Sequence, residues 1–152
     1  MTVCATKYFG STEYASAAVV HFPTGLPGFE TEYNFLPLNI SGQEPLVFLQ
    51  SVQRPDLCFV TLPVLTVDAG YRLEMAEQDL ETIGLDPSIQ PVAGTDVLCL
   101  TILTISENEV TANLLAPIVV NLRNGRAVQA VAPAHQYSHR HPVRQSQEAL
   151  CL

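Results

Sequence analysis

Three histidines near the end of the sequence, His135, His139 and His141, are the residues best suited to metal chemistry. Two histidines four residues apart can bind one metal ion when the segment is helical, because both imidazoles then share a helix face. Pro133 and Pro142 bracket this segment and argue against such a helix. A metal site also needs groups that hold its ligands in place, which a polar chain end rarely provides. We therefore expect no metal and no cofactor, and a metal-dependent enzyme on a small β-barrel remains the alternative.

Sequence signatures of covalent catalysis are missing, since there is no Gly-x-Ser-x-Gly motif, cysteine–histidine signature or glycine-rich phosphate loop. Glu77 and Glu81 are four residues apart on a predicted helix over residues 76–83, where both carboxylates face solvent. Acid–base catalysis requires a shifted pKa, and nothing nearby in the sequence would shift the pKa of either group. The four cysteines are scattered, without a Cys-x-x-Cys pair, and are interpreted as buried, inert thiols. The sequence favours a protein that is not an enzyme.

The segment 24–30, Thr-Gly-Leu-Pro-Gly-Phe-Glu, differs from an ordinary polar loop. Its two glycines and its proline favour a tight turn, whereas Leu26 and Phe29 are large apolar side chains that are unfavourable in water unless something covers them. Two interpretations stay open, because these side chains could pack back onto the core or await a partner protein. Leu26, Phe29 and the neighbouring Glu30 are therefore candidate partner-binding residues.

Charge is unevenly distributed along the chain, whose formal net charge is −8. Residues 68–96 contain seven acidic side chains and one basic side chain, whereas residues 123–152 contain four arginines and one acid. An acidic segment repels nucleic-acid phosphates and favours a basic protein partner, so we expect no direct nucleic-acid binding. Glu74, Glu77 and Glu81 are the candidate contacts, and a merely solubilising surface is the alternative.

No apolar run approaches the roughly 20 residues that a membrane-spanning helix requires. The first residues also lack the basic start, apolar stretch and cleavage site of a signal peptide. We expect a cytoplasmic monomer without membrane contact.

Strand signals dominate the 152-residue chain, in which 47% of residues are hydrophobic, enough for the core of one domain. The pattern predicts an all-β, mostly antiparallel fold, a compact β-barrel-like single domain with one or two short helices. The helix over residues 76–83 would end at Gly84, and Asn124-Gly125 predicts a two-residue hairpin turn. Residues 97–105 are apolar in both alternating sets and predict a central strand covered on both faces. The predicted strands are residues 3–8, 17–22, 33–38, 46–52, 57–62, 97–105, 118–122 and 127–131.

Several blocks of the sequence, in the same order and spacing, are similar to those of one protein family. The blocks are residues 22–30 (Phe-Pro-Thr-Gly-Leu-Pro-Gly-Phe-Glu), residues 48–52 followed by Pro55, Leu57 and Phe59, residues 100–104, 111–114 and 116–121, and the closing residues Tyr137, Arg140, His141 and Pro142. The chain thereby resembles the flagellar assembly factor FliW family. The match suggests a FliW-like β domain over residues 1–143, followed by a mobile tail at residues 144–152.

The resemblance implies a non-catalytic protein with two protein partners. One is flagellin, held in the cytoplasm before export, and the other is the translational repressor CsrA, an RNA-binding protein that family members antagonise. A member freed from flagellin binds CsrA and relieves repression of flagellin synthesis. On this interpretation Leu26 and Phe29 contact amphipathic helices of flagellin, and the acidic segment 74–86 contacts CsrA. A structural subunit of an oligomer is the remaining alternative.

Overall fold

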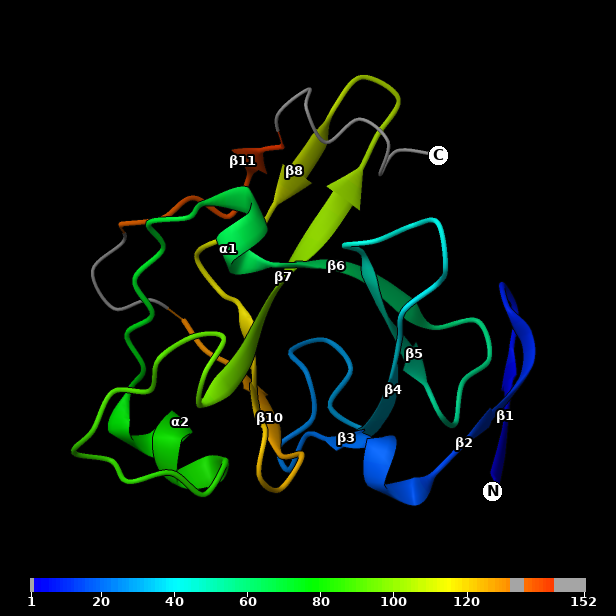
Figure 1. Cartoon of the computed structure of the whole chain (residues 1–152), viewed down its shortest axis with the longest axis horizontal. Coiled ribbons are helices and arrows are strands. Elements are labelled where there is room, and N and C mark those ends of the chain that lie inside the picture. The colour runs from blue at the N-terminus through cyan, green and yellow to red at the C-terminus, as the bar shows by residue number, and fades with distance from the viewer. Residues whose placement is uncertain (1, 132–135, 144–152) are drawn as a thin grey trace.

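The computed structural model describes residues 2–131 and 136–143 and contains one strongly curled β-sheet (Figure 1). Its strands are β3 (Val20–His21), β4 (Asn34–Leu38), β5 (Val47–Ser51), β6 (Cys58–Pro63), β7 (Val97–Ile105), β8 (Val110–Ala112), β9 (Ile118–Asn121), β10 (Ala127–Gln129) and β11 (His141–Pro142). The main path through the sheet is β10-β9-β7-β6-β5-β4-β3, while β8 pairs with the end of β7, and β11 with β8. Neighbouring strands are antiparallel, which confirms the predicted all-β class.

The two ends of the sheet approach each other, so the curl has the form of a half-barrel. The backbone N–H of His21 in β3 donates a 2.9 Å hydrogen bond to the carbonyl oxygen of Gly125, which lies shortly before β10. A β-bridge also joins His21 to Arg126. The inside of the curl holds an inner core, which consists of Val20, Phe22, Leu26, Phe35, Val47, Leu49, Leu57, Leu100, Ile118, Val120 and Ala127.

A second, outer core lies on the opposite face of the sheet, where two short helices, α1 (Val64–Val67) and α2 (Glu77–Thr82), pack against it. Met75, Leu80 and Ile83 are at most 4% exposed, which confirms the predicted buried stripe, although Met75 and Ile83 lie just outside the ends of α2. The chain leaves α2 through Gly84, whose φ of +79° is a left-handed conformation that glycine adopts at little cost. The predicted helix and its end are therefore confirmed.

Strand β7 separates the two cores. Leu100 points into the inner core, whereas Val97 and Cys99 belong to the outer core, and all three are at most 3% exposed. The prediction of a central strand covered on both faces is confirmed for most of β7. It fails at Thr104 and Ile105, which are exposed where β7 runs on to pair with β8.

A separate hairpin of β1 (Thr2–Thr6) and β2 (Gly10–Tyr14) packs beside β5 and the loop that follows it. The Cys4 thiol donates to the carbonyl oxygen of Ser51 at 3.7 Å, and the backbone N–H of Lys7 donates to Pro55 at 2.8 Å. The sequence did not predict β2, because Gly-Ser-Thr-Glu-Tyr lacks the apolar run typical of a strand.

Two local predictions are wrong. Residues 17–22 do not form one strand, because Ser16–Ala18 is a 3-10 turn and the strand begins at Val20. The turn between β9 and β10 spans the four residues 122–125, since the Asn121 N–H donates to Arg126 and the Gly125 N–H to Asn121. The sequence also gave no sign of α1, because its Val-Leu-Thr-Val run favours a strand.

Candidate partner-binding surfaces

The glycine-rich loop 24–30 follows β3 and lies inside the curled sheet, where Figure 1 shows it in blue between β7 and β4. The loop folds tightly on itself, since the Gly25 N–H donates to the Phe22 carbonyl at 3.0 Å and the Phe29 N–H donates to Leu26 at 2.7 Å. Gly25 has a φ of +71°, and a Cβ atom there would lie 2.6 Å from the carbonyl oxygen of Glu30. This position therefore requires glycine, and the loop is a compact turn.

The two apolar residues of this loop have different environments. Leu26 is 2% exposed in the inner core, so it cannot be an anchor for a partner while the loop keeps this conformation. For Leu26 the core-packing interpretation is correct. Phe29 is half-buried against Phe59, with ring centroids 5.4 Å apart and an edge-to-face angle of 82°. Part of Phe29 remains open to solvent, and the neighbouring Glu30 is exposed.

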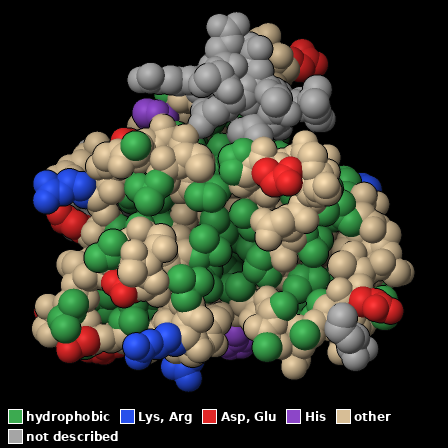
Figure 2. Space-filling view, viewed as in Figure 1, with side chains coloured by type: hydrophobic (Ala, Val, Ile, Leu, Met, Phe, Trp, Pro, Cys, Tyr) green, Lys and Arg blue, Asp and Glu red, His purple; other side chains and the backbone are tan. Residues whose placement is uncertain are grey.

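The inner core is open on one side. Figure 2 shows hydrophobic side chains gathered in a central hollow, between the positions of β7 and β4 in Figure 1. Both α-helices pack against the outer core, so neither covers the inner one. The partly buried residues that border the inner core are Phe29, Phe59, Leu98 and Ile102.

The three acidic candidates of the α2 region, Glu74, Glu77 and Glu81, are all exposed. Ion pairs within residues 2–131 and 136–143 connect Arg54 with Glu32 and Asp56, and Arg140 with Glu109. None of these ion pairs among the described residues includes the three carboxylates near α2. Asp79 on the same helix is partly buried, and this burial raises the pKa of its carboxyl group.

The loop and α2 were predicted as separate features, and the fold brings them together. A pocket of about 450 Å³ lies between them, lined by Glu30 and other residues of the loop, by Asp79 of α2 and by Val128 and Gln129 at β10. Asp79 thus belongs to the border between the two candidate surfaces. Neither periodicity nor spacing in the sequence could have shown this contact.

A larger groove of about 590 Å³ lies between the segment 84–96 and the turn 121–124. Ile89 and Leu122 both line it, and they are 63% and 55% exposed. Both sides of the groove are connected to the end of α2, because the amides of Asn121 and Asn124 donate to the Ile83 carbonyl oxygen at 2.8 Å and 3.1 Å. Sequence reasoning missed this groove.

Comparison with known proteins agrees with the sequence blocks and the fold. Residues 3–143 match the family model described as FliW protein. The chain is 36% identical over 140 residues to the flagellar assembly factor FliW of Bacillus subtilis (strain 168), covering 91% of this chain and 94% of that protein. The chain belongs to the FliW family.

Other members of the FliW family align with this chain over a similar share of its length. The flagellar assembly factor FliW of Heliobacterium modesticaldum (strain ATCC 51547 / Ice1) is 32% identical over 149 residues, which are 95% of this chain and 94% of that protein. A crystal structure of the flagellar assembly factor FliW superposes with a TM-score of 0.81 at 31% identity, over 95% of this chain and 99% of the other. The half-barrel described above is therefore the FliW fold.

The described part of this FliW-family chain was predicted to hold no metal site and to have inert thiols. No set of three or more His, Cys, Asp or Glu side chains in residues 2–131 and 136–143 is arranged to hold a metal ion, while His135 lies outside these residues. Cys4, Cys58 and Cys99 are free thiols. Burial raises the pKa of Cys58 to about 11 and that of Cys99 to about 12, so both stay protonated and unreactive at neutral pH.

The closing residues that resembled the FliW family have packing roles. Tyr137 stacks on Tyr71 with ring centroids 4.3 Å apart, and its hydroxyl accepts a 2.8 Å hydrogen bond from the Arg72 N–H. The Tyr71 hydroxyl donates to the Leu114 carbonyl oxygen at 2.7 Å. His141 lies in β11 and pairs with Ala112 of β8.

In the described residues no helix is both long enough and apolar enough to span a membrane.

Proposed function

We propose that this FliW-family protein is a non-catalytic flagellar assembly factor of the cytoplasm that binds flagellin before export and binds the repressor CsrA. Binding to CsrA antagonises its repression of flagellin synthesis. The names of the relatives, flagellar assembly factors, support the flagellar role. The proposal depends above all on the exposed acidic surface near α2, formed by Glu74, Glu77 and Glu81, whose charge no basic side chain of the described residues neutralises.

A basic protein is the complementary partner of this acidic surface. Complementary charges accelerate association and align the partners before contact. An RNA-binding repressor such as CsrA is expected to be basic, because phosphate contacts provide much of the affinity for RNA. The acidic surface therefore favours CsrA itself, and disfavours the RNA, as the direct partner.

The open side of the inner core supports the contact with flagellin. Flagellin chain ends carry amphipathic helices whose apolar faces are buried only in the assembled filament, so these faces need a cover before export. Phe29 and Phe59 form an aromatic pair that packs against the inner core and is only partly buried. Leu26 holds the loop to the inner core, and Glu30 of the same loop is exposed.

The two surfaces meet at the pocket lined by Glu30 and Asp79. A protein bound to one of these surfaces would block a second protein from reaching the other surface. The proximity supports a scheme in which flagellin and CsrA compete for this protein. CsrA then binds only after flagellin has dissociated. No observation in the described residues favours the metal-dependent enzyme.

The proposal is tested by measuring the binding of each partner to the immobilised, purified protein. We expect monomeric flagellin and CsrA each to bind alone, and saturating flagellin to reduce the binding of CsrA. Failure of both partners to bind at micromolar concentration would contradict the proposal. Simultaneous, independent binding of both would leave each interaction in place and refute the competition.

A further inference from the structure

The groove between residues 84–96 and 121–124 combines exposed apolar side chains with a firm framework. Ile89 and Leu122, from the two sides of the groove, each expose more than half of their surface. Exposed aliphatic side chains that face one concave site are typical of protein contacts. The groove involves neither Phe29 nor the exposed acids Glu74, Glu77 and Glu81.

Hydrogen bonds within the protein hold both sides of this groove. On one side, Asp86 accepts bonds from the backbone N–H and hydroxyl of Ser88 at 2.9 Å and 2.6 Å, and Asp96 accepts one from the Val92 N–H at 2.9 Å. On the other side, Asn121 accepts a 2.9 Å bond from the Arg123 N–H. A partner would meet a preformed site, which reduces the entropic cost of binding.

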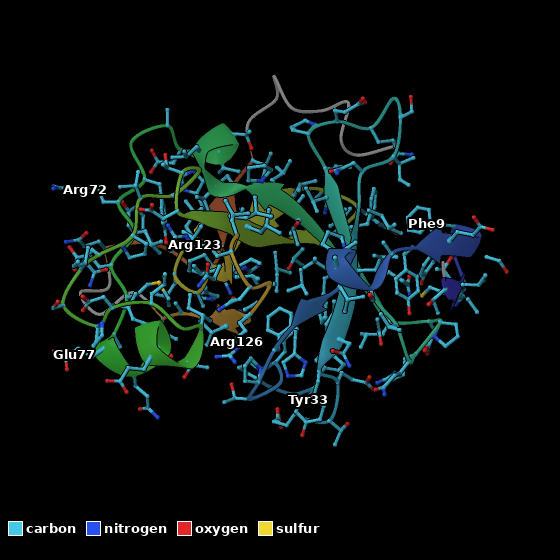
Figure 3. The ribbon with its side chains drawn as sticks, turned by 60° about the horizontal axis from the view of Figure 1, so that its bottom comes forward. Phe9, Tyr33, Arg72, Glu77, Arg123 and Arg126 are labelled. Carbon is cyan, nitrogen blue, oxygen red and sulfur yellow. The ribbon has the colours of Figure 1, made fainter. Side chains whose placement is uncertain are left out.

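The two sides of the groove carry opposite charge. Asp86 and Asp96 line it from one segment, and Arg123 lines it from the other. The Ser88 hydrogen bonds hold the pKa of Asp86 below its usual value, so this carboxylate is ionised at neutral pH. Figure 3 shows Arg123, Arg126 and Glu77 in the same half of the molecule, with Glu77 at its outer edge. Ion pairs within the described residues do not involve Arg123.

The backbone of the segment 84–96 offers few free N–H donors for pairing with an extended peptide. The N–H groups of Gly84, Leu85, Ile89, Thr95 and Asp96 all donate to carbonyl oxygens inside the protein. An added strand gains affinity by pairing with both N–H and carbonyl groups at a sheet edge, and a row of free N–H groups is missing from this segment. A bound segment must therefore satisfy its own backbone, as an α-helix does.

We propose that this groove docks an amphipathic α-helix of a partner protein, with the apolar stripe of the helix packed on Ile89 and Leu122. Basic residues along one flank of the helix face Asp86 and Asp96, and acidic residues along the other flank face Arg123. The site shares Asp86 with the acidic segment 74–86, but it includes neither Phe29 nor Glu74, Glu77 and Glu81, the contacts proposed above for flagellin and CsrA. Its failure would leave those contacts intact.

Three synthetic helical peptides of equal length and with the same leucine stripe test the proposal. One carries lysines on one flank and glutamates on the other, the second carries lysines on both flanks, and the third carries glutamates on both. Each is titrated into the isotope-labelled full chain, and NMR shift changes give the affinity and the location. We expect the mixed peptide to bind most tightly, with shift changes centred on the groove. Equal affinity for all three, or shift changes centred elsewhere, overturns the proposal.

Variants of the protein distinguish binding in the groove from nonspecific binding of the peptide. L122D should lower the affinity for the mixed peptide by about tenfold or more, since a charge replaces a central apolar contact. I105D is the matched control, because Ile105 is 49% exposed on β7 and does not line the groove, and it should bind as the unchanged protein does. Equal effects of the two variants contradict the proposal.

Charge variants of the groove should change which peptide is preferred. R123E makes both sides acidic and should favour the peptide with lysines on both flanks. The double variant D86N/D96N keeps oxygen acceptors for Ser88 and Val92 but removes the negative charge. The mixed peptide should then lose its advantage over the glutamate peptide. Unchanged preferences in both variants overturn the assignment of the flanks.

Discussion

Asn121 in β9 donates a 2.8 Å hydrogen bond from Nδ2 to the carbonyl oxygen of Ile83, the residue that ends α2. The same side chain accepts a 2.9 Å bond from the Arg123 N–H and is 2% exposed. One buried amide therefore fixes the end of the helix, the turn between β9 and β10, and the separation of the two sides of the groove.

Replacement of Asn121 by alanine should lower the free energy of unfolding by about 2 kcal/mol, because one buried and one partly buried hydrogen bond are lost at about 1 kcal/mol each. N124A is the matched control. Asn124 bonds to the same carbonyl at 3.1 Å but is exposed, so water replaces its contacts and the loss should be smaller. Urea unfolding followed by circular dichroism measures both. Equal losses would show that Asn121 has no special role.

Two glycines of the loop 24–30 give a second matched pair. G25A should destabilise the protein severely, because the new Cβ would lie 2.6 Å from the Glu30 carbonyl oxygen and φ is +71°. At Gly28, where φ is +84°, no atom lies within 4 Å of the added Cβ. G28A should therefore cost only the conformational penalty, about 1 to 2 kcal/mol. Thermal melts of the two variants compare them, and similar melting temperatures would contradict the rigid loop.

The sequence predicted the parts of the fold that depend on local pattern. Residues 97–105 are apolar in both alternating sets because β7 separates two cores. Leu80 of α2 and the neighbouring Met75 and Ile83 are apolar because this side of the helix region packs on the outer core. Local pattern failed where long-range pairing decides the structure. β2 consists of polar residues and is a strand because it pairs with β1, not because of its own apolar pattern.

The candidate surfaces were only partly predictable for the same reason. The exposed acids Glu77 and Glu81 follow from helical spacing, which is a local property. The burial of Leu26 depends on the curl of the whole sheet, which encloses the loop, and no local signal distinguishes Leu26 from Phe29. The groove joins residues 84–96 to residues 121–124, and its acidic and basic sides meet only in the folded chain.

Phe29 and Leu26 should respond differently to truncation. L26A should cost about 2 to 5 kcal/mol of stability, because a fully buried leucine leaves a cavity. That loss should affect flagellin and CsrA alike. F29A removes a half-buried ring, so its stability loss should be less than the roughly 3 to 5 kcal/mol typical of a buried phenylalanine. Its main effect should be selective weakening of flagellin binding.

Calorimetric melting and binding to each partner, measured on the same preparations, distinguish the two outcomes. A large stability loss in F29A together with equal loss of both partners would show that Phe29 serves the core alone. Normal flagellin binding by a folded F29A protein would also remove Phe29 from the proposed flagellin contact.

Charge reversal near α2 tests the proposed contact with CsrA. The double variant E77K/E81K should slow association with CsrA by about tenfold at low salt and flatten the salt dependence of the rate, because exposed charges act mainly on encounter. The dissociation rate should change less. Stopped-flow or surface-based kinetics at several salt concentrations provide both rates.

The control variant for this experiment is E13K/E107K, which changes the net charge by the same amount at two exposed acids outside α2. If the protein attracts CsrA through its overall charge, both double variants should slow association equally. If the surface near α2 is the contact, E77K/E81K should have the larger effect and the control should retain most of the rate and its salt slope. Identical rates and slopes in E77K/E81K and the unchanged protein would mean that these glutamates only keep the protein soluble.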